Sequence, residues 1–494
     1  MSALLSTVGS VVTARLYGVD IIGQVALAMA PTGMLALLST VREQPGLVRR
    51  IAPLPPRDEQ VTGIWLAVFG FSLALTVAVA IPIAVITWLL FQGPIAHPEL
   101  FAPAMVYVAA YALISNSSWN LDSIFAAYGD GRQLFVVRLH ETLVTLVLVA
   151  ALSFHPSVWS PVLAAIVGWS TALVHRVVAA RTWLSYKAGP DSVRGGLAEL
   201  GDIVRFGLKM TPGWIATGTA AQAGTWTLGM VAPVAVVGAY SRAWSISQRV
   251  VEVNWRLGEM VFPALVERHA RGDREGFDRV YVTAVRYSMT FLLGLAAVGG
   301  GTADAIMSFF GPGFQSAAPA LALTLLVPCT ATVATLQMCA LLVLGLPGAT
   351  SKVAVTTSAV TLIGTVVLTK PLGVTGPALA MALGGVLTVV FCAIIVRRHV
   401  RPSYRELWTY RQRGLLVVAY IVSFGVGRLA VSIIPGALGL LPALFAGTVA
   451  YILVFIMGRG LMPEDRKRLR QLADRVQGRS GGPAAEAPSA SSSI

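Results

Sequence analysis

Long runs of apolar residues, separated by short polar segments, cover nearly the whole chain. A helix needs about 20 apolar residues to cross the hydrocarbon layer of a membrane. The runs are continuous rather than alternating, which excludes a transmembrane β-barrel. We therefore expect an all-α polytopic membrane protein. The pattern predicts about fourteen transmembrane helices, the first of them short: 1–15, 21–40, 62–91, 102–127, 133–154, 160–182, 206–230, 236–262, 284–309, 317–345, 350–369, 375–396, 414–434 and 438–458.

The positions of the basic residues predict the orientation of these helices. If the N-terminus lies in the cytoplasm, the segments on that side of the membrane hold 31 of the 37 Lys and Arg residues. Loops on the other side contain none: 92–100, 155–159, 231–235, 310–316 and 435–437. Cytoplasmic loops carry an excess of Lys and Arg. We therefore expect a multi-pass protein of the cell (plasma or inner) membrane with both termini in the cytoplasm.

Composition narrows the classes of protein that remain. Of the 494 residues, 55% are hydrophobic and 12% are charged, about half the charged share of a soluble domain. A set of soluble domains, a disordered chain and a secreted disulfide scaffold are therefore excluded. In a soluble protein, the net charge of +14 would suggest a nucleic-acid partner. Here the positive charges lie mainly in the predicted cytoplasmic loops, so no nucleic-acid partner is expected. No catalytic or metal-binding motif occurs, so we expect no cofactor, no metal and no enzyme.

The two halves of the chain resemble each other at a fixed offset. Gly23 corresponds to Gly238, Ala102-Pro103 to Ala318-Pro319, and Gly129 to Gly345, with offsets of 215, 216 and 216. Six predicted helices lie in each repeat, so both copies keep the same orientation in the membrane. The repeat predicts two pseudo-symmetric six-helix lobes around a central cavity, and the full division is: lobe 1–186, cytoplasmic linker 187–205, lobe 206–396, two further helices 397–458, and a basic tail 459–494 with a disordered end.

The eighth predicted helix is unusual because it carries charges at membrane depth. It reads GAYSRAWSISQRVVEVNWRLGEMVFP, with arginines at Arg242, Arg249 and Arg256 and acids at Glu252 and Glu259. A spacing of seven residues is close to two helical turns, so the arginines form one stripe. The guanidinium group donates paired hydrogen bonds to phosphate. Arg249–Glu252 and Arg256–Glu259 are i,i+3 pairs that can partly neutralise each other. The stripe is interpreted as the cationic wall of a substrate cavity, or alternatively as structural salt bridges between helices, with Arg256 simply on the cytoplasmic side.

Other polar residues lie inside predicted helices. Ionisable residues at membrane depth usually face a cavity or a partner. Asn116, Asn120 and Gln222 are candidates for substrate binding, with bonding between helices as the alternative. Asp122, Glu141, Glu252 and Glu259 are candidates for ion coupling or for salt bridges. Arg15, at the end of the first predicted helix, is either a gate residue or an interface anchor.

Several short segments stand in a characteristic order over about 80% of the chain: TARLYG at 13–18 with Gly23, VGAYS at 237–241, FPAL at 262–265, RGD at 271–273 with Phe277, FGPGF at 310–314 with AAP at 317–319, and LGVTG at 372–376 with Ala378. In these segments the chain resembles the polysaccharide (oligosaccharidyl-lipid) flippases of the multidrug/oligosaccharidyl-lipid/polysaccharide (MOP) superfamily, which includes MATE transporters and O-antigen flippases.

The resemblance implies a function. It implies that the chain moves an undecaprenyl-diphosphate-linked oligosaccharide from the inner to the outer leaflet by alternating access, for surface polysaccharide biosynthesis. The implied partners are the lipid-linked glycan, membrane lipids, and a polysaccharide polymerase or glycosyltransferase. An ion-coupled multidrug exporter is the first alternative, although net positive charge in the eighth helix disfavours it. A membrane-embedded glycan polymerase is the second, and short outer loops disfavour it. The glycan, the coupling ion and the oligomeric state stay open.

Overall fold

The computed structural model describes residues 2–185, 187–208, 211–399, 410–458 and 460, and all regular structure in these residues is helical. Eleven helices in this part of the chain are long and apolar enough to cross a membrane. The prediction of an all-α polytopic membrane protein is confirmed. The count of fourteen transmembrane helices stays a prediction. The helices α9 (Thr211–Val231) and α10 (Val234–Ala270) are not among the eleven, and the helix α1 counts once although it covers two predicted spans. The basic tail from 461 lies outside the described residues.

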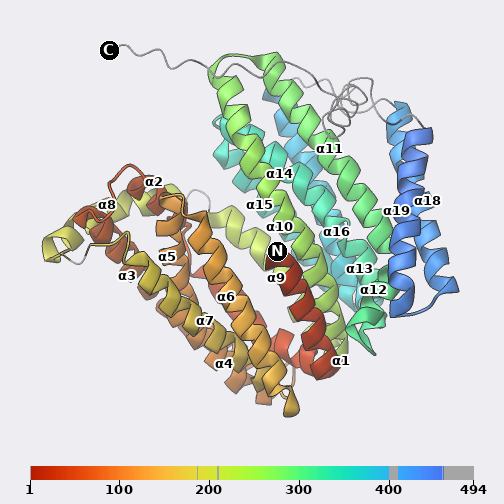
Figure 1. The fold of residues 1–494 in the computed structure, drawn as a ribbon, viewed down its shortest axis with the longest axis horizontal. Coiled ribbons are helices and arrows are strands. Elements are labelled where there is room, and N and C mark those ends of the chain that lie inside the picture. The colour runs from red at the N-terminus through yellow and green to blue at the C-terminus, as the bar shows by residue number, and fades with distance from the viewer. Residues whose placement is uncertain (1, 186, 209–210, 400–409, 459, 461–494) are drawn as a thin grey trace, which may run out of the picture.

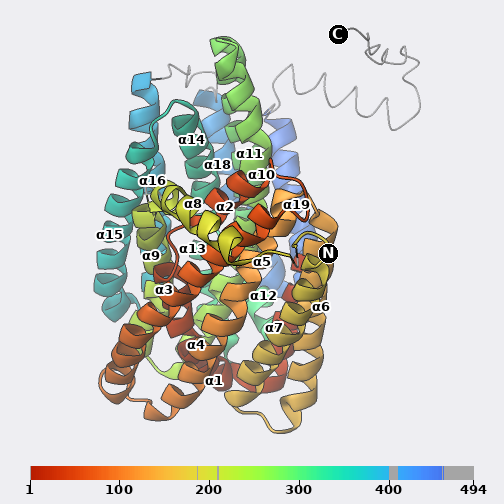
Figure 2. The ribbon, with the colours of Figure 1, turned by 90° about the vertical axis from the view of Figure 1, so that its left-hand side faces the viewer.

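The helices form two groups that meet at the lower end in Figure 1 and separate toward the upper end. We call α2–α8 the first bundle; in it α2 and α8 pack together at the upper end (Figures 1 and 2). Its helices are α2 Glu43–Ile51, α3 Glu59–Gln92, α4 Phe101–Ala110, α5 Asn116–Ala127, α6 Gly131–Ala151, α7 Trp159–Ala180 and α8 Pro190–Leu208. The predicted linker at 187–205 is therefore mostly the helix α8.

We call α9–α16 the second bundle, and the pair α18 and α19 packs on its helix α11. The bounds of these helices are α9 Thr211–Val231, α10 Val234–Ala270, α11 Arg274–Gly301, α12 Ala303–Phe310, α13 Ala318–Thr324, α14 Val327–Val343, α15 Pro347–Leu372, α16 Thr375–His399, α18 Tyr410–Ile433 and α19 Leu440–Met457.

Helix α1 (Ser2–Leu38) packs against both bundles. Gly18 interrupts it with φ 75° and ψ 172°, a conformation that glycine adopts without steric cost. Ser10, before Gly18, contacts Arg242 of α10, whereas Leu37, after Gly18, contacts Gly218 of α9. Because α9 and α10 are consecutive antiparallel helices, these contacts show that α1 reverses its direction at Gly18. Its two halves correspond to the first two predicted spans.

The two halves of the chain meet in a reciprocal contact. A Cβ atom on Gly23 would collide with the backbone oxygen of Val234, and a Cβ atom on Gly238 would collide with the backbone oxygen of Val19. The residues in each position differ by 215, which is the offset of the predicted repeat. In a contact across a twofold axis, each residue of one half meets the residue that its own equivalent meets in the other half. The glycine pair therefore lies where the pseudo-twofold axis crosses α1 and α10.

Further equivalent features support the repeat. Gly129 and Gly345 both end a helix with positive φ, 68° and 75°. A short 3-10 helix precedes both α4 and α13 (Pro98–Leu100 and Phe314–Ala317). The largest buried cluster lies around the α1–α10 crossing and includes Tyr17, Ile22, Leu27, Tyr240 and Phe314.

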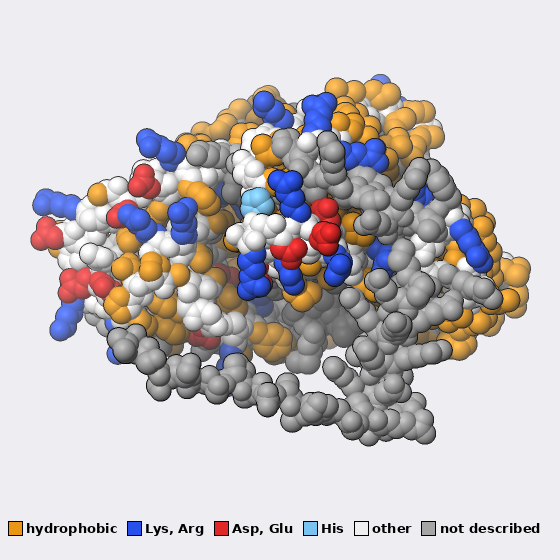
Figure 3. Space-filling view, turned by 90° about the horizontal axis from the view of Figure 1, so that it is seen from above, with side chains coloured by type: hydrophobic (Ala, Val, Ile, Leu, Met, Phe, Trp, Pro, Cys, Tyr) orange, Lys and Arg blue, Asp and Glu red, His pale blue; other side chains and the backbone are white. Residues whose placement is uncertain are grey.

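The predicted cytoplasmic loops of the first bundle lie together. The backbone N–H of Arg57 donates to the carbonyl of Trp183 at 2.9 Å, and the Tyr128 ring stacks on the Trp183 ring with centroids 4.7 Å apart. The face seen from above carries many Lys and Arg side chains (Figure 3). One end of the molecule is therefore the basic end. That this end faces the cytoplasm stays a prediction.

Candidate functional site

Arg242 lies at the contact between α1 and α10, about two turns into α10. Its Nη1 donates to the hydroxyl of Ser10 at 2.7 Å. Its Nε is buried and has no hydrogen-bond partner, and no carboxylate of the described residues lies within salt-bridge distance of the side chain. A buried charge without a partner is costly. Arg242 therefore keeps unused hydrogen-bonding capacity at the α1–α10 contact, and its role in substrate binding stays a prediction.

The other arginines of the predicted stripe differ from Arg242. Nη1 of Arg249 donates to Oε1 of Glu252 at 3.0 Å, and the two side chains are 41% and 58% exposed. Its charge is thus partly neutralised inside α10 itself. The side chains of Arg256 and Glu259 lie outside the described part of the structure. The role of all four residues remains a prediction.

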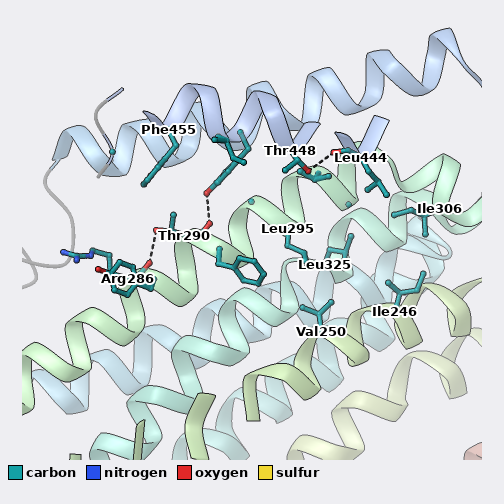
Figure 4. Close-up of a pocket in the computed structure, with 18 residues that line it drawn as sticks. Ile246, Val250, Arg286, Thr290, Leu295, Ile306, Leu325, Leu444, Thr448 and Phe455 are labelled. Atoms are coloured by element: carbon teal, nitrogen blue, oxygen red, sulfur yellow. Dashed lines mark hydrogen bonds between the residues drawn. The ribbon is translucent and has the colours of Figure 1, made fainter. Parts of the chain in front are cut away.

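An apolar groove of about 740 Å³ opens beside α10, between α11 and α19. Ile246 and Val250 of α10 form one wall, and Leu444 and Phe455 of α19 line it from the opposite side (Figure 4). Arg286 lies at one end (Figure 4). Residues 246 and 250 lie on a helix face next to that of 242 and 249. A cationic position and an apolar groove therefore lie side by side along one helix.

Asp122 and Glu141 contact a third residue within the first bundle. Nε of Arg176, on α7, lies 2.8 Å from Oδ1 of Asp122, and Nη2 lies 3.3 Å from Oε2 of Glu141. The Arg176 side chain is 5% exposed. The pair thus joins α5, α6 and α7, and its partner is an arginine of the same bundle. Arg138 lies 4.0 Å from Asp122 but is 66% exposed.

Asn116 and Asn120 lie inside the first bundle rather than at its contact with α10. Nδ2 of Asn116 donates to the hydroxyl of Thr76 at 3.0 Å, and its Oδ1 accepts from the hydroxyl of Ser72 at 3.0 Å. Nδ2 of Asn120 donates to the backbone oxygen of Asn116 at 3.1 Å. These contacts occupy both polar atoms of the Asn116 amide, whereas Oδ1 of Asn120 is buried without a hydrogen-bond partner. Substrate binding by either residue remains an untested prediction.

Gln222 and Arg15 both lie where α1 meets the second bundle. The amide of Gln222, on α9, packs against Gly33 closely enough to exclude a side chain there. Nε of Arg15 donates to the backbone oxygen of Phe309 at 2.8 Å, and its guanidinium carbon lies 5.5 Å from the centre of the Phe309 ring. Arg15 thus ties the region before the turn of α1 to α12, and its gate role stays a prediction.

The comparisons with known proteins agree with this arrangement. The family model described as "Polysaccharide biosynthesis protein" matches residues 1–269. The chain belongs to this family. A structure of the lipid II flippase MurJ in an inward closed conformation is similar with a TM-score of 0.70, at 13% identity over 93% of this chain and 97% of that one. The comparison with curated proteins gave no match.

Two MATE transporter structures have a fold similar to that of this polysaccharide biosynthesis protein. An inward-facing multidrug resistance MATE transporter of the MOP superfamily gives a TM-score of 0.68 at 13% identity, over 82% of this chain and 96% of that one. A eukaryotic MATE transporter, AtDTX14, gives 0.50 at 14% identity, over 82% and 95%. The predicted fold resemblance is confirmed. The compared proteins are transporters and a flippase rather than enzymes.

Sequence analysis did not single out three residues whose contacts the fold reveals. Arg176 pairs with the candidates Asp122 and Glu141. Glu43 is fully buried and accepts a hydrogen bond from Ser72 at 3.0 Å. Arg42, beside it, places its guanidinium carbon 4.2 Å from the centre of the Trp214 ring on α9. Burial lowers the pKa of Arg42, and the nearby charge of Glu43 raises it.

Proposed function

We propose that this chain is a flippase for an undecaprenyl-diphosphate-linked oligosaccharide, moved from the inner to the outer leaflet by alternating access for surface polysaccharide biosynthesis. The observation that carries the proposal is Arg242, a cation between α1 and α10 with no acidic partner among the described residues. Arginine is suited to a diphosphate because its planar fork donates two hydrogen bonds.

The neighbouring groove fits the other part of such a substrate. A polyprenyl chain is long and apolar, and most residues that line the groove beside α10 are aliphatic or aromatic. A lipid-linked glycan would place its diphosphate at Arg242 and its hydrocarbon along α11 and α19. Helix α19 completes the groove.

Transport in proteoliposomes tests the proposal. The purified chain is reconstituted with a fluorescent polyprenyl-diphosphate glycan, and the fraction of label that a membrane-impermeant quencher reaches is followed with time. We expect the parent chain to expose the label. Arg242→Ala should reduce the rate at least about 10-fold, because hydrogen bonds to charged groups contribute about 1.5–3 kcal/mol. Arg249→Ala should reduce it less, because Glu252 already pairs with that arginine.

The matched control is Arg428→Ala, which removes an arginine that pairs with Asp304 of α12. It should transport like the parent. Equal rates for the Arg242→Ala and parent chains would show that the cationic site is not used. A parent chain that leaves the glycan in place while it exports a cationic dye would favour the multidrug exporter instead.

A further inference from the structure

Three neutral polar groups lie unpaired where α1, α9 and α10 meet, and the proposed diphosphate site at Arg242 does not use them. They are the Thr32 hydroxyl of α1, the Trp226 indole N–H of α9 and the Tyr240 hydroxyl of α10. All three are buried without a hydrogen-bond partner among the described residues, and Thr32 and Tyr240 are only 5% and 1% exposed. Buried polar groups in folded proteins are almost always paired, so these three indicate a further partner.

The register between α1 and α9 brings Thr32 beside the middle of α9. The amide of Gln222 packs against Gly33, and Leu27 packs against Gly229 further along the same two helices. The second half of α1 and the helix α9 are therefore antiparallel neighbours. Thr32, the residue before Gly33, stands beside the turn of α9 that begins at Gln222.

Tyr240 reaches the same turn of α9 from α10. Its hydroxyl packs so closely against Gly224 that a Cβ atom there would collide with it. Trp226 follows four residues after Gln222, so the indole and the amide lie on one face of α9. The side chains of Thr32, Gln222, Trp226 and Tyr240 therefore lie within about one helical turn of each other along α9. We call these four side chains the neutral cluster.

Thr32 contrasts with a threonine of the neighbouring helix. The Thr227 hydroxyl donates to the backbone oxygen of Ala223 at 2.8 Å, one turn back in α9. A threonine inside a helix commonly satisfies its hydroxyl group in this way. The Thr32 hydroxyl makes no such bond, so its proton is available to a ligand at the contact between α1 and α9.

The neutral cluster combines hydrogen-bonding groups with two aromatic rings. Hydroxyl and amide groups of this kind fix the orientation of a ligand in a largely apolar site. The rings of Trp and Tyr join an apolar body to a polar tip. A sugar ring has the complementary surface, with hydroxyl groups at its edge and C–H groups on its faces. Because the cluster has no charged group, it suits a neutral sugar better than a cationic drug or a second phosphate.

We propose that the neutral cluster binds the sugar that is attached to the diphosphate. The inference rests on the proposed function, in which Arg242 binds the diphosphate. Tyr240 precedes Arg242 by two residues, so the two positions are about 3 Å apart along the axis of α10. In this conformation the cluster is covered, because the bundles meet at this end of the molecule (Figure 1). Alternating access moves α1 away from α9, and the sugar hydroxyl groups then supply the missing partners.

Binding of two lipids that differ only in the sugar tests the proposal. The probes are a polyprenyl diphosphate and the same lipid carrying one glucose unit, and native mass spectrometry of the purified full chain gives the two dissociation constants. We expect the parent chain to prefer the glucose lipid at least about 10-fold. Tyr240→Phe and Thr32→Val should each reduce this preference about 3- to 10-fold, the effect of one neutral hydrogen bond. Arg242→Ala should weaken the binding of both lipids equally.

Tyr17→Phe is the matched control, because the Tyr17 hydroxyl is buried but paired. It donates to the backbone oxygen of Val149 at 2.7 Å. Tyr17→Phe should therefore lower the thermal unfolding temperature and leave the preference for the glucose lipid unchanged. Tyr240→Phe removes an unpaired hydroxyl group, so it should leave the unfolding temperature unchanged or raise it. This difference distinguishes a ligand-binding hydroxyl group from a structural one.

The results separate this inference from the proposed function. If the parent chain binds both lipids equally, or if Tyr240→Phe keeps the preference of the parent, the neutral cluster does not bind the sugar, and the flippase proposal stands. If the parent chain binds neither lipid, the flippase proposal fails and the sugar site fails with it. Loss of the preference in Tyr240→Phe, with unchanged binding of the lipid that lacks glucose, would support the site.

Discussion

Arg176 joins three helices of the first bundle, and the structure indicates what its loss would do. Replacing it by Met leaves Asp122 and Glu141 in a largely apolar interior without their shared cation. Breaking a buried ion pair from one side costs about 3–5 kcal/mol. We expect Arg176→Met to lower the free energy of unfolding by about this amount, measured by thermal or denaturant unfolding in detergent.

Arg138 provides the control for this prediction, because it lies at the edge of the same cluster. It is 4.0 Å from Asp122 and 66% exposed, and exposed pairs contribute about 0–1 kcal/mol. Arg138→Met should therefore have a small effect. If both variants lose the same stability, the cluster does not depend on the buried arginine.

At this scale the sequence allows only part of the site to be predicted. Spacing within one helix reveals Arg242 and the pair Arg249–Glu252, because both depend on local geometry. It does not reveal that Arg176 faces Asp122, since that contact depends on how α5 and α7 pack. Glu43 was hidden for a different reason: it stands beside loop arginines, and the packing of α2 against α5 and α8 buries it. Contacts between distant segments are not encoded in residue spacing.

At the scale of elements, the crossing of α1 and α10 depends on two glycines. A methyl group on either one meets a backbone oxygen, which cannot move aside as a flexible side chain can. Overpacking of this kind costs about 1–3 kcal/mol. We expect Gly23→Ala and Gly238→Ala to lower the thermal unfolding temperature by similar amounts, because the two contacts are reciprocal.

Gly70→Ala is the matched control for this pair. Gly70 lies in the middle of α3 with open space at its Cβ position, so the substitution should be neutral or slightly stabilising. The double variant at Gly23 and Gly238 should cost less than the sum of the two single changes, because neighbouring sites are not independent. If the Gly23→Ala chain is as stable as the Gly70→Ala chain, α1 and α10 can move apart at their crossing without loss of stability, which would contradict the prediction.

Breaks inside helices limited the prediction of elements. Hydropathy marks 102–127 as one span, but the structure inserts a π-helix at Tyr111–Ser115 between α4 and α5. Likewise, 317–345 is divided into α13 and α14, with Pro328 near the start of α14. Such breaks change hydrogen bonds of the backbone without changing the apolar character of the segment, so a hydropathy pattern cannot reveal them. The turn at Gly18 was predicted because polar residues and glycine interrupt the run.

At the scale of the whole molecule, α1 is the mechanical connection between the bundles. Its first half contacts α10 and its second half contacts α9, while it also packs on α3, α4 and α6. The pseudo-twofold crossing at Gly23 and Gly238 lies near the turn of α1, at the end where the bundles meet. Glu43 and Arg42 lie toward the opposite, basic end. A relative motion of the bundles about the crossing would therefore be largest at the basic end.

The orientation of this arrangement in the membrane gives the last prediction. Of the 37 Lys and Arg residues, 31 lie in segments predicted to be cytoplasmic, and this bias sets orientation in the membrane. Arg271, in the turn between α10 and α11, and Ser316, in the 3-10 helix before α13, are both exposed and lie at opposite ends of the second bundle. In intact cells, a membrane-impermeant maleimide should label Ser316→Cys and should label Arg271→Cys only after permeabilisation. The unmodified chain, whose cysteines lie within helices, sets the background. The reverse labelling pattern would place the basic end outside the cell and would contradict the predicted orientation.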